Sequence, residues 1–298
     1  MSSSTTSDRI FSGACGNRLV ATRRLAPTWH SQGQAVALLL HGGGQTRHAW
    51  DGTARALAVT GWQSVALDQR GHGDSAWIED GAYSFADFGA DALVVGRAIT
   101  AETGVKPVAV GASLGGLASL LALAESVSDP VFSALVLVDI VPQMDPRGVD
   151  HIKGFMRAHA AEGFASVEAA ADAIAAYLPH RPRPRSLAGL SKNLRLQADG
   201  RFRWHWDPRF LDGPRPVAAD WDIMAGKLDA VTRAMPVPSL LVRGASSELV
   251  TEAAAEAFLA LSPTTQYANI SEARHMVAGD KNDAFAEAVV GFLAQIRG

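Results

Sequence analysis

A serine flanked by small residues is the strongest chemical feature of the sequence. Ser113 is the centre of the run Gly111-Ala112-Ser113-Leu114-Gly115, which follows an apolar stretch at 108–110 and precedes a helical pattern at 114–126. At a sharp turn between a strand and a helix, a serine hydroxyl stands above the sheet edge, and small neighbours are needed because bulk would collide with both elements. The helix N-terminus favours the negative charge that develops during attack. The pattern predicts that Ser113 is a nucleophile.

A glycine run follows an earlier apolar stretch at 35–40. Its sequence is His41-Gly42-Gly43-Gly44. Acyl transfer to a serine needs backbone N–H groups aimed at the tetrahedral oxyanion, and glycines let the main chain approach the substrate. We expect one donor from Leu114, after the nucleophile, and the other from Gly43, with Gly44 as the alternative. A phosphate-binding loop is disfavoured, because no Lys-Ser or Lys-Thr pair follows and no G-x-G-x-x-G pattern fits.

A histidine late in the chain is placed to act as the general base. His275 lies in a loop between the last predicted strand, at 266–270, and the last predicted helix, at 282–296. Such a loop can deliver an imidazole to the carboxyl ends of the strands, and the order of nucleophile first and histidine last suits this architecture. His41, beside the glycine run, is instead expected to pack and to form hydrogen bonds.

Two carboxylates compete to be the acid that orients His275. Asp139 follows the apolar run at 135–138, and Glu248 follows the run at 239–242. Either strand end can present a carboxylate to the far nitrogen of the imidazole. Counted from Gly244, the position that commonly holds this acid is Ser247, one residue before Glu248. An acid alone at the end of a buried strand is costly without a partner, which favours Asp139.

The elements that must position these residues alternate along the chain. Apolar runs without polar alternation predict strands buried on both faces, at 35–40, 64–67, 108–110, 135–138 and 239–242. Helical spacing is found at 51–59, 85–99, 114–126, 149–159, 167–177 and 251–261. The strand pattern is lost between 142 and 235. We therefore predict an α/β core made of 1–141 and 236–298 around a mostly parallel sheet, with a helical cap inserted at 142–235.

Composition narrows the class of protein. The chain has 298 residues, of which 48% are hydrophobic and 19% charged, so we expect a large core. Its net charge of -3 gives no reason to expect nucleic acid or a membrane surface as a partner. One cysteine, Cys15, rules out an intrachain disulfide, and the N-terminus does not resemble a signal peptide, so a cytoplasmic location is expected. No cluster has metal-ligand spacing, and we expect neither a metal nor an organic cofactor. Monomer and homodimer both stay open.

The order of these motifs resembles that of the α/β-hydrolase superfamily. The resemblance covers nearly the whole chain and includes the turn Gly71-His72-Gly73-Asp74-Ser75, which is structural in that superfamily. The chain is most similar to capped bacterial serine esterases whose seventh strand ends in R-G-x-x-S, matched here by Arg243 to Ser247. Some of those esterases use the aspartate after the sixth strand, so the resemblance favours Asp139. It also places the helical cap after the sixth strand.

The resemblance implies a function together with its alternatives. We expect hydrolysis of carboxylic esters or lactones through an acyl-enzyme on Ser113, with a small-molecule ester as the partner. Alternatives with the same triad are a C–C bond hydrolase, a lyase of the menaquinone-pathway type, and a haloperoxidase-like or perhydrolase-like enzyme. Epoxide hydrolase and haloalkane dehalogenase chemistry is disfavoured, because those relatives carry aspartate at the nucleophile. Gly44, Trp204 and Trp206 are candidate substrate contacts beneath the cap.

Overall fold

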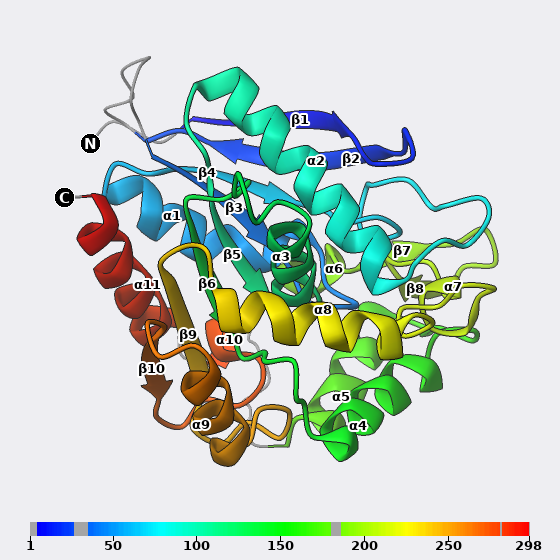
Figure 1. Ribbon diagram of the computed structural model, residues 1–298. Coiled ribbons are helices and arrows are strands. Elements are labelled where there is room, and N and C mark those ends of the chain that lie inside the picture. Colours follow the sequence, from blue (N-terminus) through cyan, green and yellow to red (C-terminus); the bar gives the residue numbers. More distant parts are fainter. Residues whose placement is uncertain (1–4, 27–34, 180–185, 281, 298) are drawn as a thin grey trace.

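The fold is built around one eight-stranded sheet (Figure 1). The computed structural model describes residues 5–26, 35–179, 186–280 and 282–297; residues 1–4, part of the N-terminus predicted to carry no signal peptide, lie outside these ranges. Across the sheet the strands are β1 (Thr6–Ser12), β2 (Arg18–Arg24), β4 (Gln63–Leu67), β3 (Val36–Leu40), β5 (Val108–Ala112), β6 (Ala134–Val138), β9 (Ser239–Gly244) and β10 (Gln266–Ile270). In the described part of the chain, only β2 runs against the other strands of this sheet. The predicted mostly parallel sheet is confirmed.

Both faces of the sheet are buried, as the uninterrupted apolar strands predicted. In β3, Leu38 and Leu40 belong to one core cluster, while Ala37 and Leu39 belong to the other. This alternation follows from the two-residue period of a strand. The helices that cover the two faces are α1 (Asp51–Val59), α2 (Phe85–Thr103), α3 (Leu114–Ala124), α8 (Trp221–Ala234), α9 (Glu252–Leu261) and α11 (Asn282–Arg297). Helices α1 and α11 share one face, and α2, α3 and α8 pack together on the other (Figure 1).

The chain leaves the sheet after β6 and returns to it at β9, which pairs directly with β6. The intervening elements are α4 (Pro146–Ala158), α5 (Val167–Tyr177), α6 (Ala188–Ser191), β7 (Leu194–Leu196), β8 (Phe202–Trp204), α7 (Arg209–Asp212) and α8. Strands β7 and β8 form a separate two-stranded sheet. Two backbone hydrogen bonds tie this segment to the turn after β4: Gly73 N–H to the His205 carbonyl (2.7 Å) and Asp207 N–H to the Gly71 carbonyl (2.8 Å). The cap boundaries at 142 and 235 stay a prediction.

The antiparallel pair β1 and β2 was not predicted from the sequence. Its outer strand, β1, has mostly exposed residues and carries Asp8 and Arg9, so it lacks the apolar run by which the inner strands were found. Such polar and charged residues are common on edge strands, where they discourage pairing with other chains. The strand forms because it pairs along its whole length with β2, from Thr6 with Arg24 to Ser12 with Arg18.

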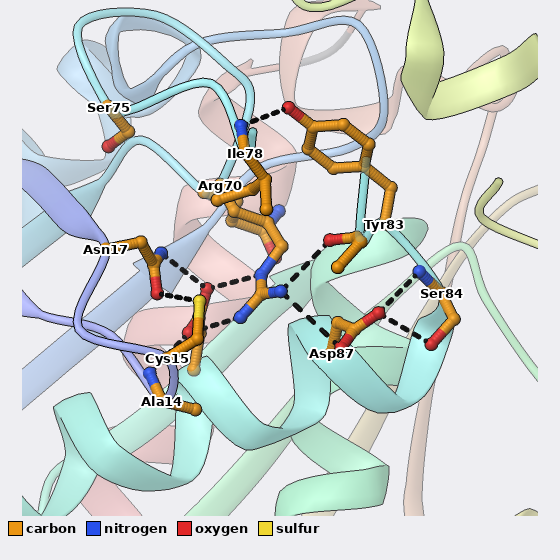
Figure 2. Close-up of polar contacts among 12 residues, drawn as sticks. Ala14, Cys15, Asn17, Arg70, Ser75, Ile78, Tyr83, Ser84 and Asp87 are labelled. Atoms are coloured by element: carbon orange, nitrogen blue, oxygen red, sulfur yellow. Dashed lines mark hydrogen bonds and ion pairs between the residues drawn. The ribbon is translucent and has the colours of Figure 1, made fainter. Parts of the chain in front are cut away.

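A buried arginine fixes the connection between β4 and α2 (Figure 2). The Nε and Nη2 of Arg70 each donate to one oxygen of Asp91 on α2, both at 2.7 Å, and its Nη1 donates to the Ala82 carbonyl at 3.0 Å. Asp91 also accepts the backbone N–H of Ala14, in the turn between β1 and β2 (2.8 Å). Because a bidentate pair fixes direction as well as distance, this cluster ties three segments together beside the predicted site.

Candidate active site

Ser113 occupies a sharp turn between β5 and α3. Its backbone has φ 47° and ψ −113°, a left-handed conformation that costs a non-glycine residue about 1–3 kcal/mol. The flanking glycines permit the turn: a Cβ on Gly111 would lie 2.4 Å from the Gly115 carbonyl oxygen, and one on Gly115 would lie 2.3 Å from the Leu40 carbonyl oxygen. The small residues are therefore required by backbone contact, as the sequence suggested.

His275 and Asp139 meet at the carboxyl edge of the sheet. The Nδ1 of His275 lies 2.8 Å from Oδ2 of Asp139, whose carboxylate is fully buried after β6. The same carboxylate accepts the backbone N–H of Gly244 at 2.9 Å and the hydroxyl of Ser247 at 2.5 Å. These donors satisfy the buried charge. With Nδ1 held by Asp139, the other nitrogen, Nε2, is left for proton transfer.

Glu248, the other candidate acid, lines the same cavity wall but forms no hydrogen bond with His275 among the described residues. Within the described residues, the hydrogen bonds of His275 include one to Asp139 and none to Glu248. One carboxylate oxygen of Glu248, Oε2, is buried without a hydrogen-bond partner among the described residues. Burial, together with this nearby carboxylate, raises the pKa of the Tyr177 phenol to about 12. The geometry therefore favours Asp139 as the partner of His275 and puts Glu248 beside Tyr177.

The glycine run after β3 forms a tight turn. Gln45 closes the turn in both directions, since its N–H donates to the Gly42 carbonyl (3.1 Å) and its Oε1 accepts the Gly42 N–H (3.0 Å). Gly44 has φ 77°, and its N–H donates to Nε2 of His72 at 3.1 Å. The backbone N–H groups of Gly42, Gly44 and Gln45 thus all donate hydrogen bonds to other groups of the protein.

Two backbone amides beside Ser113 remain available. Among the described residues, none accepts the N–H of Gly43 or of Leu114. Both residues line the same cavity as Ser113. Of the two alternatives left open by the sequence, Gly43 and Gly44, only Gly43 has an uncommitted N–H group, so the geometry favours Gly43.

Two buried histidines flank the glycine turn. His41 and His72 are both fully buried, and their ring centroids lie 5.2 Å apart. Burial lowers the pKa of His41 from 6.5 to about 4 and that of His72 to about 3. For His72, repulsion from His41 acts in the same direction. Both imidazoles are therefore neutral at neutral pH and can accept hydrogen bonds through Nε2.

These lowered pKa values predict acid sensitivity. Below about pH 6.5 the unfolded chain binds protons at His41 and His72 that the folded chain does not bind, so the free energy of unfolding falls as the pH falls. At about pH 4.5 we expect a loss of about 2.5 kcal/mol from each imidazole. Urea unfolding across this pH range measures it. The variant His72→Gln should show a shallower pH dependence, and an unchanged slope would contradict the assignment.

A large cavity adjoins these groups. Its volume is about 1080 Å³, and its wall includes Ser113, His275 and Gly43 from the core. The segment between β6 and β9 supplies a further part of the wall, which includes the aromatic and sulfur-containing side chains Phe155, Met156, Tyr177, Trp204, Trp206 and Phe210. Gly44, Trp204 and Trp206, the candidate substrate contacts, all line this cavity.

The cavity wall holds an ordered aromatic group. Phe155 on α4 stacks on Tyr177 on α5, with ring centroids 4.1 Å apart and an angle of 12° between the ring planes. Phe155 also contacts Trp204, at 6.0 Å between centroids. Phe210 reaches the glycine turn, because a Cβ on Gly43 would lie 3.3 Å from its ring. The wall is therefore mainly apolar and closely packed against the turn.

Two contributors were missed by sequence reasoning. Ser247 stands where the acid commonly lies, yet its hydroxyl donates to Asp139. The R-G-x-x-S run marked this position without indicating its partner. The sequence predicts only a structural turn at His72, and no pattern in it joins His72 to Gly44, because the two lie 28 residues apart.

The part of the chain that the structure describes has neither a metal-binding cluster nor a membrane-spanning helix. In the described part of the chain, no group of three or more His, Cys, Asp or Glu side chains is placed to hold a metal ion. No helix among residues 5–26, 35–179, 186–280 and 282–297 is both long and apolar enough to cross a membrane.

Comparison with known proteins identifies the family. The model of the alpha/beta hydrolase fold family matches residues 36–281, and the chain therefore belongs to this family. Esterase Rv0045c of Mycobacterium tuberculosis is 34% identical over 262 residues, which cover 86% of this chain and 82% of that protein. The sn-1-specific diacylglycerol lipase ABHD11 of Mus musculus is 28% identical over 281 residues, with coverage of 86% and 80%.

Solved structures agree with the fold. A crystal structure of Esterase Rv0045c superimposes with a TM-score of 0.72 at 26% identity, over 98% of this chain and 92% of that one. An E-2-(acetamidomethylene)succinate hydrolase gives a TM-score of 0.80 over 97% of this chain and 100% of that one, at 21% identity. The second likeness supports the fold alone.

Proposed function

We propose that this protein is a serine esterase that cleaves carboxylic esters or lactones. The observation that carries the proposal is the hydrogen bond between His275 and the buried Asp139, at the sheet edge where Ser113 stands in its strained turn. An imidazole held in this way accepts a proton at its other nitrogen, and the carboxylate stabilises the imidazolium that forms. The relative at 34% identity is an esterase by name, which agrees with this chemistry.

The reaction proceeds in two halves. The Ser113 oxygen attacks the ester carbonyl while Nε2 of His275 takes its proton, and the N–H groups of Gly43 and Leu114 hold the tetrahedral oxyanion. The C–O bond to the alcohol then breaks, and His275 returns the proton to the leaving oxygen. Water attacks the acyl-enzyme with His275 again as base, which releases the acid and restores Ser113. For a lactone, acid and alcohol leave as one molecule.

The cavity indicates the kind of ester. Its large volume and mainly apolar wall suit an apolar acyl or alcohol group. Helices α4 and α5, together with Trp204 of β8, supply much of that wall, so we assign the segment between β6 and β9 the role of the predicted cap, which sets substrate size and excludes water.

Chain length is expected to matter. Each additional buried methylene contributes about 0.8 kcal/mol, or about fourfold in kcat/KM when the gain appears in the transition state. We expect kcat/KM to rise from p-nitrophenyl acetate to the butanoate and hexanoate, until the chain outgrows the cavity. A steady fall from the acetate onward would contradict an apolar acyl site.

The same ester panel tests the proposed function itself. Wild-type protein should release p-nitrophenol, and a fluorophosphonate should inactivate it with loss of turnover. No turnover for any chain length or for simple lactones, together with no reaction of Ser113 with the fluorophosphonate, would overturn the proposal and leave the C–C hydrolase and lyase alternatives to be tested.

A further inference from the structure

The turn that carries Gly43 is held by a histidine from another loop. His72 lies in the connection between β4 and α2, and its Nε2 accepts the Gly44 N–H at 3.1 Å. Its Nδ1 lies 2.9 Å from the Arg70 carbonyl, to which it can only donate. Because a nitrogen that accepts an N–H group carries no proton, these two contacts assign the neutral tautomer with hydrogen on Nδ1.

The surroundings of His72 preserve this state. The ring is fully buried and packs edge-on against Phe210 of α7, with centroids 5.0 Å apart, and against Phe88 of α2 at 6.2 Å. The burial that lowers its pKa to about 3 keeps the ring neutral at neutral pH. The acceptor facing Gly44 is therefore present throughout the usual pH range of an assay.

The backbone that orients His72 is itself anchored. Arg70, whose carbonyl accepts the hydrogen bond from Nδ1 of His72, is drawn with its polar contacts in Figure 2. Its guanidinium donates to Asp91 and to the Ala82 carbonyl. The turn that contains His72 is also tied to the segment after β8, because the Gly73 N–H donates to the His205 carbonyl. His72 is thus held in place relative to the sheet. Its hydrogen bond with Gly44 therefore restrains the position of the glycine turn.

The glycine turn needs such a restraint. Glycine samples both signs of φ, so the peptide between Gly43 and Gly44 can rotate unless a hydrogen bond prevents it. Gly44 already has φ 77°, and the bond to His72 is the contact that its N–H makes. The Gly43 N–H lies in the preceding peptide, which is joined to this one at the Gly43 Cα, so a shift of the rotated peptide at that Cα would also turn the Gly43 N–H away from the oxyanion.

We propose that His72 is a positioning residue for the oxyanion hole, because it holds the Gly44 N–H and so fixes the direction of the Gly43 N–H. This inference rests on the proposed function, in which the Gly43 amide stabilises the tetrahedral oxyanion. His72 itself touches neither substrate nor Ser113 in this mechanism. Its effect should therefore appear in kcat and in transition-state binding, and much less in KM.

Two variants separate the two hydrogen bonds of the ring. In His72→Gln the side-chain oxygen reaches the place of Nε2, so the acceptor for Gly44 is kept and the donor to Arg70 is lost. In His72→Asn the amide nitrogen takes the place of Nδ1, so the donor to Arg70 is kept and the acceptor is lost. A purely structural role would make the two variants similar.

We expect His72→Asn to lower kcat by about 10- to 100-fold, since removal of a whole oxyanion donor costs about 10²–10³, while KM stays within about threefold. A trifluoromethyl ketone, which forms a tetrahedral adduct with the serine, should bind more weakly by the same factor. His72→Gln should retain most of the wild-type kcat and most of the affinity for the trifluoromethyl ketone. Equal losses in the two variants, or an Asn variant with unchanged kcat, would overturn the inference.

Wild-type protein supplies a second, independent measurement. Nitrogen NMR should show Nε2 of His72 unprotonated, with scalar coupling across the hydrogen bond to the Gly44 amide. A protonated Nε2 would overturn the inference even if neither variant folds. Failure of the proposed function is distinguishable, because in that case wild-type protein would not react with a fluorophosphonate at Ser113.

Discussion

Replacement of Asp139 by asparagine is expected to lower kcat by about 10⁴-fold with little change in KM, because an amide favours the wrong tautomer of the imidazole and cannot stabilise the imidazolium. The carboxylate is fully buried and contacts His275 at 2.8 Å, so it is shielded from solvent where it meets the imidazole. Steady-state kinetics on the best p-nitrophenyl ester measure this loss.

The matched control is Glu248→Gln, the same exchange of a carboxylate for an amide in the wall of the same cavity. Since Glu248 makes no hydrogen bond to His275 among the described residues, its variant should keep kcat within about threefold of wild type, as expected for a group outside the triad. A large loss in Glu248→Gln with an active Asp139→Asn would transfer the role of the acid to Glu248. Thermal unfolding of both variants excludes loss of fold as the cause.

Replacement of Ser113 by alanine should have the largest effect, a fall in kcat of about 10⁵–10⁶-fold. The acyl-enzyme cannot form without its oxygen, whereas Gly43 and Leu114 can still polarise a bound carbonyl. Because the cavity wall is unchanged, the affinity for a non-reactive substrate analogue should stay within about threefold of wild type.

Ser119→Ala provides the comparison for that variant. Ser119 lies in α3, the helix that Ser113 precedes, and its buried hydroxyl donates to the Gly115 carbonyl at 2.8 Å without lining the cavity. We expect it to lower stability by about 1 kcal/mol and to leave kcat nearly unchanged. Retention of more than about a hundredth of the activity in Ser113→Ala would contradict the assignment of the nucleophile.

The parts of the fold that could be predicted are those with strong local patterns. The buried strands before Ser113 and Asp139 are apolar on both faces, so short runs of residues reveal them. The turn at Ser113 is also visible in a short run of residues, because both glycines are required by close backbone contacts, Gly111 within the turn and Gly115 against Leu40 of the neighbouring strand β3. Strand β1 was not predicted, because this edge strand is mostly exposed and lacks such an apolar run.

The choices left open by the sequence depend on contacts between distant segments. Asp139 and Glu248 both follow strands that end at the same edge, and only the path of each side chain decides which one reaches His275. Gly43 and Gly44 are neighbours of the same type, and it is His72 from another loop that engages one of them. Spacing along the chain carries no information on either outcome.

The most direct test of the account is to find the covalent intermediate. Wild-type protein mixed rapidly with a p-nitrophenyl ester should release a burst of about one equivalent of p-nitrophenol, the expected sign of acyl-enzyme accumulation. Mass spectrometry of the quenched protein should place one acyl group on Ser113 and none on Ser113→Ala. Turnover with no acyl group on Ser113, or with the acyl group on another residue, would contradict the account.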